Sequence, residues 1–135
     1  MEADVYNAHR EGPWRAPDED RKMMRIKDVK AISPRDKGIV AEVKEVALRL
    51  LPAAEVYLYG SVARGNHGPE SDYDFLVVTG APLTAQKEET VWDAVFDIEV
   101  AHGVPISVQF CAKDEWERHQ NMPFYLEVRR DGIAL

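Results

Sequence analysis

The sequence predicts an α/β domain, and two kinds of pattern carry that prediction. Short runs rich in β-branched and aromatic residues occupy positions 56–59, 75–78 and 105–111, as is typical of buried strands. Apolar residues recur at helical spacing across positions 34–51 and 84–101. A length of 135 residues suits one domain with a modest core.

The two long helices have recognisable ends. Ser33 can cap the first helix, Asp36 falls where the acid of a capping box sits, and Pro52 stops the helix. Thr84 can cap the second helix, which Gly103 ends. Both helices are expected to pack an apolar face against the strands.

Further helical signals follow in the second half of the chain. Trp92 and Phe96 are four residues apart and are expected to widen the apolar side of the second helix. Two short helices are expected at 114–120 and 124–128, with a break at Pro123 between them.

The composition is ordinary for a globular protein, with 45% hydrophobic and 30% charged residues. No apolar run approaches the length of a membrane span, and no signal peptide opens the chain, so no membrane contact is expected. The single cysteine, Cys111, excludes an internal disulfide. A cytoplasmic location is therefore the default expectation.

The net charge of −7 is unevenly distributed. Residues 1–51 hold 11 Lys and Arg against 10 Asp and Glu, whereas residues 52–135 hold 6 against 14. The acidic second part argues against a broad nucleic-acid surface and fits a metal site better.

Two parts of the chain are distinguished by composition. Residues 1–30 contain the breakers Gly12-Pro13 and Ala16-Pro17 and are expected to form an N-terminal extension, docked or flexible. Residues 31–135 are expected to form the folded domain.

The strongest chemical signal begins where the strand at 56–59 ends. Gly60 lets a backbone approach a ligand without a Cβ in the way. Ser61 offers a hydroxyl and an N–H group at the start of the next turn, where phosphate binds well. Arg64 follows one helical turn later, and its planar fork suits phosphate.

Two carboxylates enter the strand that follows. Asp72 and Asp74 are two residues apart, so on a strand both point to the same side. Unpaired, they would repel each other, and a divalent cation removes that penalty. Mg²⁺ is usually held by one or two carboxylates together with substrate phosphates. The stretch therefore predicts a site for a metal-bound nucleoside triphosphate.

The segments G-S-V-A-R-G at 60–65 and S-D-Y-D at 71–74 resemble the minimal nucleotidyltransferase domains of the DNA polymerase β-like superfamily. The resemblance extends over residues 35 to 135. It implies an α/β fold with a small mixed sheet and packed helices, similar to the polymerase β palm. An apolar C-terminal segment that packs back on the sheet is a further feature of such domains.

The resemblance also implies a function. Gly60 and Ser61, with Arg64 nearby, would bind the nucleotide. Asp72 and Asp74 would be the catalytic residues and would ligate two Mg²⁺ ions. The implied reaction is nucleotidyl transfer, typically of AMP from ATP, to a hydroxyl of a protein or a small molecule.

The sequence departs from the family on the strand at 105–111. Active members commonly carry a third carboxylate there, and this chain offers Ser107 or Gln109. Three outcomes stay open. The two aspartates suffice for slow transfer, or a carboxylate elsewhere, such as Glu99 or Asp114, completes the site. Otherwise the site binds Mg-nucleotide without turnover.

The resemblance suggests partners as well. Small nucleotidyltransferases often pair with a HEPN-domain protein as a toxin–antitoxin system. A catalytically degenerate, antitoxin-like module that binds a HEPN-type partner is therefore the alternative function. A homo-oligomer is also compatible with the small size of the chain.

Overall fold

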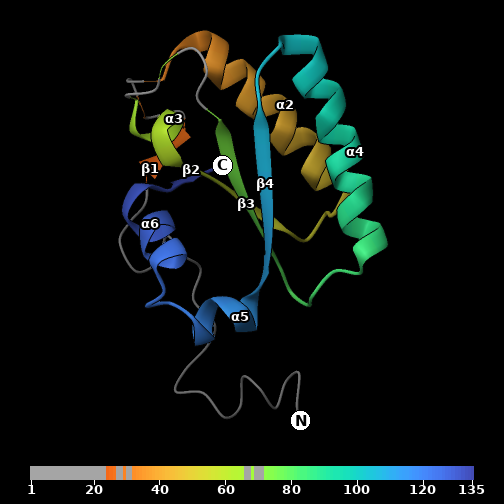
Figure 1. Ribbon diagram of the computed structural model, residues 1–135, viewed down its shortest axis with the longest axis vertical. Helices are drawn as coiled ribbons and strands as arrows, with labels where there is room; N and C mark the ends of the chain where they lie inside the picture. The colour runs from red at the N-terminus through yellow and green to blue at the C-terminus, as the bar shows by residue number, and fades with distance from the viewer. Residues whose placement is uncertain (1–23, 27–28, 30–31, 66–67, 69–71) are drawn as a thin grey trace.

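The computed structural model describes residues 24–26, 29, 32–65, 68 and 72–135. These residues form a five-stranded sheet with helices on both sides (Figure 1). The strands are β1 (Met24–Arg25), β2 (Glu55–Tyr59), β3 (Tyr73–Thr79), β4 (Ile106–Ala112) and β5 (Ile133–Ala134). The helices are α2 (Pro34–Leu50), α3 (Gly60–Arg64), α4 (Ala85–His102), α5 (Lys113–Arg118) and α6 (Pro123–Asp131).

The sheet is mixed, as the resemblance implied, with strand order β1-β5-β2-β3-β4. β2 is antiparallel to both β3 and β5, whereas β3 and β4 run parallel to each other, as do β1 and β5. The C-terminal end of β2 therefore lies at the same edge as the N-terminal ends of β3 and β4. This edge carries the residues singled out from the sequence.

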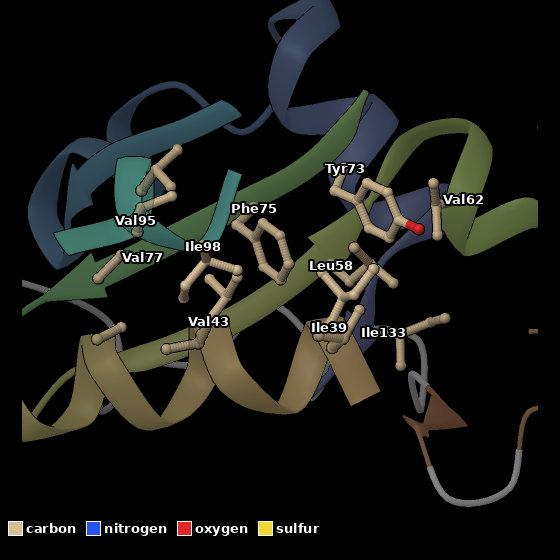
Figure 2. Close-up of a cluster of buried hydrophobic side chains, with 14 of the residues drawn as sticks. Ile39, Val43, Leu58, Val62, Tyr73, Phe75, Val77, Val95, Ile98 and Ile133 are labelled. Carbon is tan, nitrogen blue, oxygen red and sulfur yellow. The ribbon is translucent and has the colours of Figure 1, made fainter. Parts of the chain in front are cut away.

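Helices α2 and α4 lie side by side on one face of the sheet (Figure 1). Their apolar faces supply the main core with β3: Ile39 and Val43 come from α2, Val95 from α4, and Phe75 and Val77 from β3 (Figure 2). Burying a side chain of this size contributes about 1.5–3 kcal/mol. The core thus anchors alternate residues of β3 and fixes which face the others point to.

A smaller apolar cluster covers the opposite face. Its buried members share one side of the sheet and the inner sides of α5 and α6, and they are Tyr57, Tyr59, Leu76, Val78, Cys111, Trp116, Val128 and Ala134. Because strand residues alternate between faces, Asp74 is on the same side as Leu76 and Val78. Asp74 therefore emerges where this cluster meets the sheet edge.

The predicted helix starts are confirmed. The Ser33 hydroxyl accepts a hydrogen bond from the Asp36 N–H group at 3.1 Å, and the Thr84 hydroxyl accepts one from Lys87 N–H at 3.2 Å. The carboxylate of Asp36 is buried and accepts a hydrogen bond from the Tyr73 hydroxyl. The capping prediction did not include this contact, which ties α2 to the first residue of β3.

Trp92 and Phe96, which were expected to widen the apolar side of α4, are exposed, with exposed fractions of 46% and 58%. The reason is the position of α4 beside β4, the last strand of the sheet. Trp92 lies over that strand, donating to the Val108 carbonyl at 3.1 Å. Among the described residues β4 is the edge strand, so no strand of that part of the chain covers Phe96.

The structure also adds elements that the sequence did not predict. The turn expected at Gly60 is the first residue of the short helix α3, and the chain end forms β5, which pairs with β1 and β2. β1 falls within the predicted extension at 1–30, most of which lies outside the described residues. None of the helices in the described part of the chain has the length and apolarity needed to cross a bilayer.

Candidate functional site

The candidate site lies where three strand ends meet. The register places Tyr59, the last residue of β2, beside Asp74, and Asp74 beside Ser107 of β4. Gly60 follows Tyr59 directly as the first residue of α3. The strand ends thus bring together residues as far apart in sequence as Tyr59 and Ser107.

The Asp74 carboxylate lies close against the backbone of Gly60. The φ angle of Gly60 is +82°, a backbone conformation that side-chain-bearing residues rarely adopt. A Cβ at this position would overlap Oδ2 of Asp74 and lie 3.3 Å from its Cγ. The glycine therefore leaves the space that the Asp74 carboxylate occupies.

Ser61 lies in the first turn of α3 and is partly exposed. The helix is anchored by Val62 and Ala63, which are buried in the main core. Gly65 ends α3 with φ +77°. This anchoring holds the Ser61 hydroxyl and the nearby backbone at the same sheet edge as Asp74.

The two aspartates differ in exposure. Asp72 is exposed, whereas Asp74 is partly buried. Burial raises the pKa of Asp74 to about 6, aided by the negative charges of Asp72 and Glu127 and opposed by Arg64. The ionised form of Asp74 is therefore unfavourable without a counter-charge. A divalent cation would supply that counter-charge.

The residues present fit a Mg²⁺–nucleotide. Two carboxylates, Asp72 and Asp74, lie beside a backbone stretch without a Cβ, and oxygen donors are what Mg²⁺ prefers. Within the described residues, no three side chains among His, Cys, Asp and Glu lie close enough together to hold an ion by themselves. Substrate phosphates and water would have to complete the coordination.

Arg64, expected near the nucleotide, is engaged by α6. Its guanidinium donates to Asp131 Oδ2 at 2.8 Å. Arg130 donates to the same carboxylate, with its Nε bonded to Oδ1 at 3.0 Å. These two arginines, Arg130 foremost, hold the pKa of Asp131 below its ordinary value. Arg64 thus links the end of α3 to the end of α6 at the border of the site.

The register resolves which β4 residue lies beside the aspartates. Ser107 is the partner of Asp74, whereas Gln109 pairs with Leu76, two residues deeper along the strand. Of the two β4 residues that the sequence offered in place of a third carboxylate, Ser107, with its neutral hydroxyl, is therefore the one beside Asp74.

The acids that the sequence offered as substitutes are engaged elsewhere. Glu99 accepts a hydrogen bond from the Ile106 N–H group at 2.6 Å, and Asp114 pairs with Arg118 at 3.0 Å. Both carboxylates thus have partners outside the candidate site. Their contacts are local and structural.

Glu127 of α6 is the site residue that the sequence analysis missed. Its charge contributes to the raised pKa values of both Asp74 and Tyr59, in each case after larger causes. Positions 124, 127, 128 and 131 share one helix face by their spacing. The sequence could therefore predict which residues share this helix face, but nothing in it indicated that α6 would pack beside α3.

Comparison with known proteins gives one match. The sequence model described as "Nucleotidyltransferase domain" matches residues 40–128, about two thirds of the chain. The match includes α3, both aspartates and β4. No curated protein matches the chain.

Proposed function

Because the chain belongs to the nucleotidyltransferase domain family, we propose that it transfers a nucleotidyl group, AMP from ATP, to a hydroxyl of a protein or a small molecule. The observation that carries the proposal is the contact between Gly60 and Asp74, which puts the start of α3 beside the aspartate pair. The residues that would bind the phosphates therefore lie next to the aspartates that would bind the metal ion.

Each residue has a distinct task. The backbone at Gly60 and the hydroxyl of Ser61 bind the β- and γ-phosphates, since no Cβ blocks the approach. Asp72 and Asp74 would hold Mg²⁺. The ion would supply positive charge where negative charge develops in the transition state.

The reaction needs one bond to form and one to break. The acceptor oxygen bonds to the α-phosphorus, and the bond from that phosphorus to the oxygen bridging to the β-phosphate breaks. Pyrophosphate leaves, and the acceptor proton passes to water or a nearby base. Arg64 stays with Asp131 at the border of the site, where its charge favours the ionised form of Asp74.

One observation favours a second function. Ser107, beside Asp74, neither ligates a second cation well nor acts as a base, so a site that binds Mg-ATP without turnover is the alternative. Such a module would act through a partner, for example a HEPN-domain protein. The exposed apolar residues Trp92, Phe96 and Val100 on α4 offer a surface for one.

The test uses ATP labelled at the α-phosphate, Mg²⁺ and host extract as a source of acceptors. Wild type is run beside Asp72→Ala. Label on an acceptor with wild type alone supports the transferase, and the labelled species names the acceptor. Binding of Mg-ATP without any labelled product supports the non-catalytic module.

A further inference from the structure

Glu127 occupies a particular place on α6. Phe124, one turn before it, packs edge to face on Tyr59 with ring centroids 5.5 Å apart. Asp131, one turn after it, binds Arg64 at 2.8 Å. The flanking residues of the same helix face therefore touch both ends of the stretch that contains Gly60. Glu127 lies between these two residues on that helix face.

The packing of neighbouring elements agrees with this placement. α6 contacts α3 and β2, and Figure 1 shows α6 and α3 near each other at the left of the sheet. Val128, next to Glu127, is fully buried in the smaller apolar cluster. Because Val128 fixes the rotation of α6, Glu127 is held at the rim of that cluster.

Glu127 is also uncommitted. Among the described residues it forms no hydrogen bond or ion pair, unlike Asp131, which two arginines engage. Its helix packs on β2 through Phe124 and Tyr59, and Tyr59 is the strand neighbour of Asp74. Glu127 thus adds negative charge near the aspartate pair, offset in part by Arg130 three residues along the same helix.

We propose that Glu127 supplies the third carboxylate of the site, delivered from α6 in place of the acid that β4 lacks at Ser107. The inference rests on the proposed function, because it assigns a residue to the same metal–nucleotide site. Glu127 acts on the bound cations by its charge and through metal-bound water, since the three carboxylates do not form a closed ligand set.

If Glu127 takes the place of the acid on β4, the third negative charge reaches the site from a different direction. An acid at Ser107 would approach Asp74 from β4, whereas Glu127 approaches from the side of β2 and α3. The β4 side of Asp74 is then left with a small neutral side chain. The acceptor hydroxyl has room to enter on that side.

The experiment measures Mn²⁺ binding by electron paramagnetic resonance, in the presence of an ATP analogue that cannot be cleaved between the α- and β-phosphates. Four proteins are compared: wild type, Glu127→Gln, the double variant Glu127→Gln with Ser107→Asp, and Glu89→Gln. Glu89 is an exposed residue of α4, so its variant controls for the loss of one negative charge away from the site.

We expect Glu127→Gln to weaken Mn²⁺ binding about tenfold, the lower end of what loss of an outer-shell partner costs. Glu89→Gln should bind as wild type does. The double variant should regain most of the lost affinity, because a carboxylate returns beside Asp74. Thermal unfolding without metal checks that each variant is folded, and Glu127→Ala replaces Glu127→Gln if that variant is not.

Equal affinity of wild type and Glu127→Gln overturns the inference and leaves the proposed function standing. A loss that the double variant does not recover overturns the claim that Glu127 replaces the β4 acid. Wild type that binds no Mn²⁺ with the analogue overturns both the inference and the proposed function.

Discussion

At the residue scale, Gly60 and Asp74 depend on each other. The sequence predicted that glycine would allow a backbone to approach a ligand. The structure adds a contact within the chain, because the Asp74 carboxylate fills the space where a Cβ would lie. Gly60 thus has two reasons to be glycine, its φ of +82° and its neighbour.

Gly60→Ala is predicted to abolish Mg-ATP binding. The new Cβ displaces the Asp74 carboxylate, and the positive φ costs about 1 kcal/mol of stability. Gly103→Ala is the matched control, since Gly103 also has a positive φ, +67°, but nothing within 4 Å of the added Cβ. Thermal unfolding and equilibrium dialysis with labelled ATP measure the two effects.

Both variants should lower the melting temperature, Gly60→Ala the more because of its overlap with Asp74, and only Gly60→Ala should lose ATP. Normal ATP binding by a folded Gly60→Ala protein would show that the position of Asp74 does not matter for the nucleotide.

Asp74→Asn is predicted to stabilise the metal-free protein at neutral pH. The pKa of Asp74 in the folded state, about 6, lies above its ordinary 3.8, so the folded protein holds this proton more tightly than the unfolded chain does. The stability that this proton contributes is complete below about pH 4 and is lost as the pH rises through 6. Asparagine removes that loss.

Urea unfolding in the presence of a chelator provides the measurement. At pH 8 the variant should be more stable by about 1 kcal/mol, a figure reduced for solvent screening of a half-exposed group. At pH 4 the two proteins should be nearly equal. A variant that is less stable than wild type at pH 8 would argue that Asp74 is stabilising when ionised.

At the element scale, the sequence predicted the long elements and the short helices α5 and α6, but it missed α3 and the two-residue strands β1 and β5. The helices α2 and α4 and the strands β2 to β4 follow from local periodicity and capping. β1 and β5 have two residues each and exist because they pair with each other and with β2. Their pairing partners are distant in sequence, so local pattern carries no sign of them.

The site residues likewise fall into a group that the sequence predicted and a group that it missed. Gly60, Ser61 and the aspartates stand within one short stretch and were predicted from it. Glu127 and Asp131 lie more than fifty residues later, and they join the site only because Phe124 packs on Tyr59. Such a contact depends on how α6 packs in three dimensions, which spacing alone does not reveal.

Tyr73→Phe is predicted to cost about 2 kcal/mol of stability, because the buried Asp36 carboxylate loses a hydrogen-bond donor. Tyr57→Phe is the comparison on the neighbouring strand, where the hydroxyl donates to the partly exposed Glu55 at 2.7 Å. That loss should be below about 1 kcal/mol. Urea unfolding at pH 7 distinguishes them, and equal effects would show that the contact between α2 and β3 is not special.

At the scale of the whole molecule, one face of the sheet packs on the main core and the other face carries the candidate site. The core under α2 and α4 fixes β3 from one face, and α6 brings charges to the other face at the edge where β2 ends (Figure 1). The acidic second part of the chain collects several of its charges at this edge. Its surplus of negative charge fits a cation that arrives with the nucleotide.

The most direct test of this account is ATP binding to the purified protein by isothermal titration calorimetry, with Mg²⁺ or with a chelator. It requires no acceptor. We predict saturable binding with Mg²⁺ at one site per chain, loss of that binding in the chelator, and loss in Asp72→Ala. ATP binding that persists without Mg²⁺, or that Asp72→Ala leaves unchanged, would contradict a metal–nucleotide site at this sheet edge.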